Sequence, residues 1–506
     1  MQFKRRRGFA LQIKRVLSVL LTIALLCALP VAASAKGKDL RKKDVSEYPG
    51  LTFHGGFHEL YYNENTPEQT LAFDPGAVGG IMEAVAGDLL KAVATLNMDR
   101  AADILKQAMW DWFGEVRMDE SGRSVNKGLS CDGPFRLPEY EGGPAFDTDW
   151  RLSPIENADR LHKYLTYAEK RYGVKKFNLD GLSAHGATVL AYLDKYGTDK
   201  VASLVFNISM HRGSSLFGAI AKKEFRFNME ALSRMNSFDA LGLDLAAFQP
   251  ILRALFETGL LDVLGRFLRL ASSDLLDRVY EEVVIPLFFM IPSFWVYVPL
   301  EDYEAAKAVL LKGDPKYAGL VKKIDAYYKI AQRADDIILE ASKTMKVAVW
   351  AGYGQPLVPV GDGASVQSDI LLDTHYGSLG ATCAPPGKPF DLFYQQQVDD
   401  GHDHISPDRL VDASTCLLPD QTWFGKNKTH GSDIDYDGWR SWFYTTDNAT
   451  VFENPRYPQF MEKLEDGQFI PVTDKPSKGG VIANNAFLGS MENWRRVVLL
   501  PLFWIK

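Results

Sequence analysis

Residues 153–208 alternate between helix-like and strand-like patterns, and this alternation constrains the fold more than any other stretch. Ser153-Pro154-Ile155-Glu156 combines a capping box with a proline at the first helical position. The predicted elements are, in order, a helix ending at Gly173, a strand over 174–180, a helix over 187–196 and an apolar strand over 201–208. Helix–strand–helix–strand with such short connections predicts a parallel sheet with right-handed crossovers.

The length of 506 residues would allow about three domains, but the alternation indicates one α/β domain carrying a large insertion. The apolar stretch 283–300 is long enough to span a membrane. Pro286, Pro292 and Pro299 argue against one continuous helix there, so we interpret the region as a helical cap over an apolar cleft. The predicted parts are a signal peptide (1–35), the first part of the core (36–213), the cap (214–342), the second part of the core (343–432) and a C-terminal extension (433–506).

Residues 1–35 have the parts of a secretory signal peptide: a basic start, an apolar stretch over 16–33 and the small-residue end Ala33-Ser34-Ala35. The alternative is an uncleaved membrane anchor, since the apolar stretch approaches spanning length. Pro30 and its small neighbours favour cleavage. We therefore predict a secreted or extracytoplasmic protein, in which one disulfide (Cys383–Cys416) could form but a disulfide framework could not.

Charge limits the partners. Without residues 1–35, which hold six basic and no acidic residues, the chain has 51 Lys and Arg against 64 Asp and Glu, a net charge of −13. This balance argues against a nucleic-acid partner. The basic-then-apolar segment 495–505 could contact a membrane surface, although we prefer a last strand or helix packed on the core.

Gly181-Leu182-Ser183 lies between a predicted strand and a predicted helix, which is the context of a nucleophile elbow. Such a turn lifts the Ser183 hydroxyl above the sheet, and the amide of Ala184 at the start of the helix could hold an oxyanion. The usual pattern Gly-x-Ser-x-Gly is altered here, because His185 takes the last position and Gly186 follows it. The alternative is a serine in an ordinary strand–helix loop.

A serine nucleophile needs a base and an acid. Among nine histidines, His430 best fits the chain order Ser…Asp…His, in which the base follows the last strand. Two similar segments, 368–373 and 407–412, offer the acid. We favour Asp408, 22 residues before His430, and keep Asp369, 61 residues before it, as the alternative acid.

The segment 51–56 ends in His54-Gly55-Gly56 after strand-like sequence, and the Gly56 amide is the predicted second oxyanion donor beside that of Ala184. Phe57 and Trp295 are the predicted substrate-binding side chains.

The run Asp399-Asp400-Gly401-His402-Asp403-His404 has the residue types of a metal site. It lacks the spaced ligands of a closed zinc site, so we interpret it as a solvated loop and predict no metal and no cofactor.

Four pieces together resemble one known family: Asp149-Trp150-Arg151-Leu152-Ser153-Pro154, the elbow and helix over 181–192, the cap segment 292–299, and Asp408-Arg409-Leu410-Val411 with His430. They resemble the α/β-hydrolase superfamily, and within it the lipases and acyltransferases related to lecithin:cholesterol acyltransferase. The resemblance implies a mostly parallel, doubly wound sheet with a large helical cap. It also implies a serine hydrolase for lipid-like esters with Ser183, Asp408 and His430 as triad. The alternatives are a lipid acyltransferase, or a catalytically impaired lipid-binding protein on the same fold.

Overall fold

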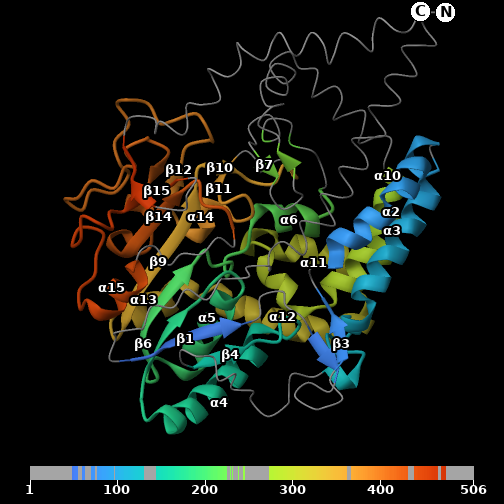
Figure 1. Ribbon diagram of the computed structural model, residues 1–506, viewed down its shortest axis with the longest axis horizontal. Coiled ribbons are helices and arrows are strands. Elements are labelled where there is room, and N and C mark those ends of the chain that lie inside the picture. The colour runs from blue at the N-terminus through green and yellow to red at the C-terminus, as the bar shows by residue number, and fades with distance from the viewer. Residues whose placement is uncertain are drawn as a thin grey trace, which may run out of the picture.

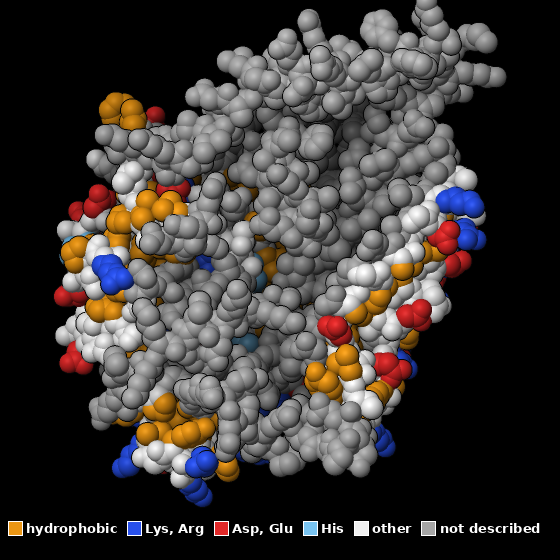
Figure 2. All heavy atoms as spheres, in the orientation of Figure 1, with side chains coloured by type: hydrophobic (Ala, Val, Ile, Leu, Met, Phe, Trp, Pro, Cys, Tyr) orange, Lys and Arg blue, Asp and Glu red, His pale blue; other side chains and the backbone are white. Residues whose placement is uncertain are grey.

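The computed structural model describes residues 48–54, 60–62, 70–74, 77–95, 97–129, 144–224, 228, 231, 237–238, 243–244, 273–361, 366–430, 438–464 and 469–473. The predicted signal peptide and the apolar segment 495–505 lie outside these ranges. On the face drawn in Figure 2, the described Lys and Arg side chains are interspersed with Asp and Glu and do not gather into one basic patch.

An eight-stranded sheet forms the centre of the fold (Figure 1). Its strands, in spatial order, are β16 (Phe469–Pro471), β15 (Phe460–Lys463), β14 (Thr422–Lys426), β9 (Lys346–Tyr353), β6 (Val201–Asn207), β5 (Phe177–Asp180), β1 (Gly50–His54) and β4 (Ala145–Asp147). Seven strands run parallel and only β16 pairs antiparallel, with β15. The predicted mostly parallel α/β sheet is confirmed. Because the strands are parallel, their carboxyl ends meet along one edge of the sheet, which is where sites form in such folds.

Helices cover both faces of this sheet. Neighbouring residues of a strand point to opposite faces. Trp350 of β9 packs edge-on against Trp439 of α15 (Trp439–Thr445), with ring centres 5.2 Å apart. The next residue, Ala351, points to the other face, and α14 (Thr374–Gly377) also packs on β9. α5 (His185–Tyr196) packs against α4 (Pro154–Tyr172), α12 (Ala318–Ala331) and α13 (Ala334–Ser342).

The helix predicted from the capping box is α4. The Ser153 hydroxyl oxygen accepts from the Glu156 amide, and the Glu156 carboxylate accepts from the Ser153 amide, so both halves of the capping box are formed. Gly173 ends the helix with φ 69°, in the left-handed region that glycine reaches without strain. α5 begins at His185, two residues earlier than predicted, because the Gly-x-Ser turn passes directly into the helix.

The cap region is mostly helical where it is described. Its elements are α6 (Ser215–Ala221), β7 (Ser237–Phe238), β8 (Leu243–Asp244), α10 (Ser273–Val279), η5 (Tyr280–Phe289), η6 (Pro292–Tyr297), η7 (Leu300–Asp302), α11 (Tyr303–Leu311) and η8 (Pro315–Tyr317), before α12 and α13. The prolines divide the apolar stretch as expected: Pro286 lies inside the π-helical η5, Pro292 begins η6 and Pro299 precedes η7. Nowhere in the described ranges is there a helix with the length and apolar character needed to cross a membrane.

The remaining elements surround this core. β2 (Leu60–Tyr62) and β3 (Thr70–Phe73) form a hairpin, and α2 (Val78–Ala94) lies beside α3 (Met98–Phe113), on which α10 packs (Figure 1). Short elements complete the set: η2 (Gly114–Val116), η3 (Lys127–Leu129), β10 (Gln355–Pro356), β11 (Gln367–Ser368), β12 (Thr382–Cys383), β13 (Val411–Asp412), η10 (Ala413–Thr415) and η11 (Pro419–Gln421).

Two expectations need correction. The core does not end at residue 432, because β15 and β16 add two strands beyond β14, so part of the predicted C-terminal extension belongs to the central sheet. These strands have three or four residues each, too short for a clear alternation of apolar and polar positions. Cys383 and Cys416 are free thiols, and the disulfide considered for them is absent. Burial raises the pKa of both thiols well above the usual value.

Candidate active site

Ser183 occupies a tight turn between β5 and α5. Its φ is 50°, a left-handed conformation that is uncommon for a residue with a side chain. The turn is supported by the neighbouring strand β6: the amides of Gly181 and Ser183 donate to the carbonyls of Val205 and Asn207, at 2.8 and 3.0 Å. A strained turn held by surrounding hydrogen bonds is the local geometry that the predicted elbow requires.

The glycine that permits this close approach is Gly186. A Cβ there would lie 1.6 Å from the Ser209 hydroxyl oxygen. His185, which stands where the common pattern has glycine, turns away from the elbow. Its ring is buried, with Nε2 2.9 Å from Thr148 Oγ1 and its centre 5.2 Å from that of Phe53. The altered pattern is therefore accommodated, because the position that must be small has moved one place along the chain.

A continuous hydrogen-bonded chain joins Ser183, His430 and Asp369. Ser183 Oγ lies 2.9 Å from His430 Nε2, and His430 Nδ1 lies 2.8 Å from Asp369 Oδ2. The side chains of His430 and Asp369 are 4% and 1% exposed. An ionised carboxylate can only accept, so Nδ1 carries the proton and Nε2 is left to accept from the serine hydroxyl.

The Asp369 carboxylate is itself fixed by the backbone. Its Oδ1 accepts from the amides of Leu371 and Leu372 at 3.1 and 2.7 Å, and its carbonyl accepts from the His430 amide at 2.8 Å. Gly352, near the end of β9, leaves room for this turn, since a Cβ there would lie 2.6 Å from Asp369 Cβ. Both oxygens of the carboxylate are thus occupied, one by the backbone and one by the imidazole.

Asp408, the favoured acid, does not contact His430; the alternative, Asp369, is the carboxylate that lies beside the imidazole. The Asp408 carboxylate instead accepts a hydrogen bond from the Ser406 hydroxyl at 2.7 Å and forms an ion pair with Lys426 Nζ at 3.0 Å. The tyrosine hydroxyl of Tyr353 donates to it at 3.3 Å.

The two similar segments adopt similar turns, which explains the error. The residue after each aspartate has a positive φ, 84° at Ile370 and 57° at Arg409. In both, the aspartate Oδ1 accepts an amide two residues later. The sequence pattern therefore predicts the turn correctly but does not say which copy lies beside His430. Both aspartates lie in the connection between β9 and β14, which contributes no strand to the central sheet, so the strand order does not distinguish them either.

Other histidines with described rings have different partners. His162 stacks on Tyr196, His375 faces the Ala381 carbonyl, and His211 Nδ1 lies 2.7 Å from the Ser209 hydroxyl. Burial, with a smaller contribution from Arg212, lowers the pKa of His211 to about 3, so that ring is neutral.

Of the two predicted oxyanion donors, only Ala184 lies in the part of the chain that the structure describes. Ala184 follows Ser183 at the start of α5, so its amide lies at the positive end of the helix dipole. Gly56 and Phe57 lie outside the described residues. β1, which precedes them in the chain, pairs in parallel with β5, with Leu51 opposite Leu179.

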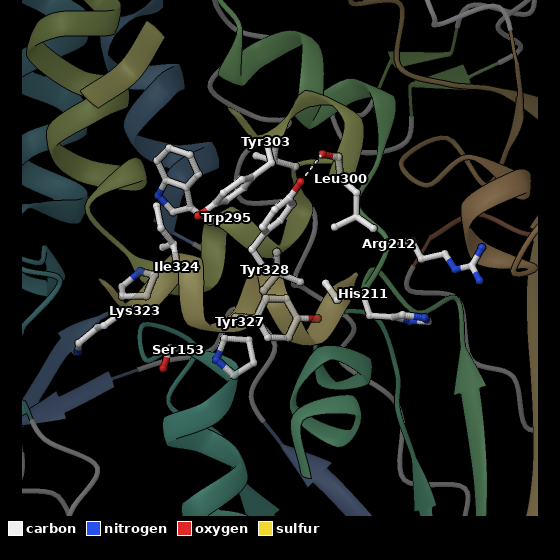
Figure 3. Close-up of a pocket in the computed structure, with 15 residues that line it drawn as sticks. Ser153, His211, Arg212, Trp295, Leu300, Tyr303, Lys323, Ile324, Tyr327 and Tyr328 are labelled. Carbon is white, nitrogen blue, oxygen red and sulfur yellow. Dashed lines mark hydrogen bonds between the residues drawn. The ribbon is translucent and has the colours of Figure 1, made fainter. Parts of the chain in front are cut away.

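A cavity adjoins the elbow. Its lining is mixed: the apolar residues Trp150, Leu152, Pro154, Ala184 and Val296 stand beside the polar residues Thr148, Asn157, His185, Thr188, Ser293 and Tyr297. Trp295, predicted to bind substrate, lines a different cavity together with His211 and three tyrosines (Figure 3). Trp295 is 3% exposed and donates from Nε1 to the Phe289 carbonyl, so it packs within the cap. Figure 3 also shows Tyr328 donating to the Leu300 carbonyl across this second cavity, at 3.3 Å.

The motif Asp149–Pro154 has a structural explanation. Arg151 and Asp149 form a buried ion pair, with Nη2 and Oδ2 2.8 Å apart and side chains 1% and 2% exposed. Burial alone would raise the pKa of Asp149, but the charge and hydrogen bonds of Arg151 outweigh it and hold that pKa below its usual value. The motif therefore anchors the loop that enters α4.

Comparisons with protein-family models, with curated proteins and with solved structures found no match to this chain. The resemblance to lipases and acyltransferases therefore rests on the sequence motifs alone.

Proposed function

We propose that this chain is a serine hydrolase of the α/β-hydrolase type that cleaves carboxylic esters with apolar, lipid-like acyl groups. The observation that carries the proposal is the hydrogen-bonded chain from Asp369 through His430 to Ser183, at the carboxyl edge of a parallel sheet. The left-handed turn at Ser183 supports the same reading, since it directs the hydroxyl away from the backbone.

In this proposal Ser183 Oγ attacks the ester carbonyl carbon while His430 Nε2 takes the hydroxyl proton. Asp369 stabilises the resulting imidazolium. The Ala184 amide and the amide proposed at Gly56 hold the negative charge that develops on the carbonyl oxygen. Collapse of the tetrahedral intermediate breaks the ester C–O bond, and His430 returns its proton to the departing alkoxide, which leaves as an alcohol.

The acyl-enzyme is then resolved by the reverse sequence. His430 removes a proton from water, the hydroxide attacks the acyl carbon, and Ser183 leaves as its alcohol with the proton returned by His430. A second alcohol in place of water would make the same site an acyltransferase. Product analysis with and without an added long-chain alcohol separates these two outcomes.

The apolar side chains Trp150, Leu152 and Val296 in the cavity beside Ala184 are suited to a hydrocarbon acyl group, and Asn157, Thr188 and Ser293 add polar groups to its wall. The buried cap segment 283–298 adds to the apolar surroundings of the site. The proposed location is outside the cytoplasm, in keeping with the signal-peptide pattern of residues 1–35. Contact with a membrane or lipid surface stays a prediction from segment 495–505.

The test is hydrolysis of p-nitrophenyl esters of increasing acyl length by the purified chain and by Ser183→Ala. We expect activity that rises with acyl length and is lost in the variant, with an unchanged thermal unfolding midpoint. Ser203→Ala is the matched control, because Ser203 is a buried serine bonded to Asn178 and far from the carboxyl edge. Equal hydrolysis by Ser183→Ala and the parent chain contradicts the proposal, and a folded parent chain that hydrolyses no ester favours the lipid-binding alternative.

A further inference from the structure

Four side chains with metal-ligating atoms converge at the opposite end of β14 from His430. Asp400, His402 and His404 come from the loop that the sequence predicted to be solvated, and Asp420 comes from η11, just before β14. One ligand atom from each lies within 4.8 Å of all the others. The sequence pattern at 399–404 does not include Asp420, which lies sixteen residues beyond His404 in the chain.

The buried member of this cluster is His404, whose side chain is 0% exposed. Its Nδ1 lies 2.9 Å from Gln459 Oε1. The orientation of the Gln459 amide is fixed, because its nitrogen donates to the carbonyls of Pro419 and Thr422 at 2.8 and 3.1 Å. Oε1 therefore accepts from His404 Nδ1–H, and a neutral ring presents the lone pair of Nε2 to the cluster.

That lone pair faces two carboxylates. Nε2 lies 3.0 Å from Asp400 Oδ2 and 3.5 Å from Asp420 Oδ1. Asp420 Oδ1 is itself buried and has no hydrogen-bond donor in the part of the chain that the structure describes. Acceptor atoms this close repel one another unless a positive charge lies between them, which is either a proton on Nε2 or a metal ion.

The position of His402 favours a metal ion over a proton as the positive charge in this cluster. His402 Nδ1 lies 3.6 Å from the same Asp420 Oδ1, so a second imidazole points to the place where the charge is needed. The Phe452 ring packs on His402 with centres 4.3 Å apart and limits its movement. In tetrahedral zinc sites the bonds of about 2.1 Å place neighbouring ligand atoms about 3.4 Å apart. Three of the six separations in this cluster, 3.0, 3.5 and 3.6 Å, lie close to that value, and all six are within 4.8 Å.

We propose that Asp400, His402, His404 and Asp420 bind a divalent transition-metal ion, with zinc the best fit to two imidazole nitrogens and two carboxylate oxygens. Calcium and magnesium fit less well, since they take oxygen ligands. The site joins the loop at 400–404 to the start of β14 and, through Gln459, to the start of β15. Its role is structural, because β14, five residues and roughly 17 Å long, separates it from His430.

Three roles follow for residues near the ion. Asp400 Oδ1 accepts the His402 amide at 3.0 Å, which leaves Oδ2 for the metal. Gln459 is a positioning residue that sets the tautomer of His404. Asp403 lies in the same loop but its carboxylate accepts the Ile405 amide, so it provides a matched control.

The test uses the full chain without a histidine tag, stripped with EDTA and titrated with zinc against a chromophoric chelator, with calcium and magnesium in parallel. We expect one equivalent of zinc bound with a submicromolar dissociation constant. Asp420→Asn and His404→Gln should weaken binding at least 100-fold, Gln459→Leu about 10- to 100-fold, and Asp403→Asn less than threefold. Zinc should raise the thermal unfolding midpoint of the stripped parent chain, a readout that needs no variant to fold.

Two results overturn the proposal. One is a folded parent chain that holds no zinc after stripping and reloading and whose unfolding midpoint zinc does not change. The other is zinc bound equally well by Asp420→Asn. In either case the four side chains do not form a zinc site, and the positive charge beside Nε2 is a proton.

Discussion

Replacing Asp369 by asparagine is expected to reverse the tautomer of His430 while leaving the fold intact. Asp369 Oδ1 accepts two backbone amides, from Leu371 and Leu372, and only the oxygen of an asparagine can take that place. The new NH2 group must therefore face His430 Nδ1, where it donates. Nδ1 then becomes an acceptor, and the ring proton moves to Nε2, which can no longer accept from Ser183.

An inverted tautomer of this kind lowers turnover by ~10⁴-fold in serine enzymes, which corresponds to about 5.5 kcal/mol of transition-state stabilisation. The assay is the turnover number for the best p-nitrophenyl ester of the panel, measured for Asp369→Asn beside Asp408→Asn. Asp408 pairs with Lys426 and does not contact His430, so its asparagine variant should keep turnover within threefold of the parent chain. A large loss in Asp408→Asn with near-normal activity in Asp369→Asn would refute the reasoning.

Three further outcomes are expected. Gly352→Ala should cost about 1–3 kcal/mol of unfolding free energy and most of the esterase activity, because its Cβ would lie 2.6 Å from that of Asp369; urea unfolding and turnover measure the two effects. Gly87→Ala, within α2 and with no atom within 4 Å of the added Cβ, should instead raise the unfolding free energy by about 0.5–1 kcal/mol and leave activity unchanged. Asp149 binds a proton less readily when folded than when unfolded, so its ion pair with Arg151 contributes stability above about pH 4 that is lost as the pH falls further. Asp149→Asn should therefore lose less unfolding free energy than the parent chain between pH 5 and pH 3, and an equal loss in both would contradict the assignment.

The parts of the site that the sequence predicted are those defined by local pattern. Gly181-Leu182-Ser183 between a strand and a helix places the candidate nucleophile, and the position after β14 places His430, since both depend on elements that the sequence marks clearly. The capping box of α4 was predicted for the same reason, as every residue it needs lies within four positions.

The candidate acid could not be chosen locally, because Asp369 and Asp408 lie in turns of the same kind and differ in the side chain they contact, His430 for Asp369 and Lys426 for Asp408. The four-residue cluster at Asp420 was missed because its ligands come from two segments that only the tertiary fold brings together. β15 and β16 were not predicted because strands of three or four residues are defined by pairing with their neighbours in the sheet and not by their own sequence pattern.

The most direct test of the central claim is to treat the folded chain with a fluorophosphonate and map the modified peptide by mass spectrometry. We expect a single modification at Ser183, absent in Ser183→Ala and strongly slowed in His430→Ala, because the reagent reports a serine activated by a neighbouring base. A folded parent chain that stays unmodified, or one modified at another serine at the same rate in both variants, would contradict the catalytic account.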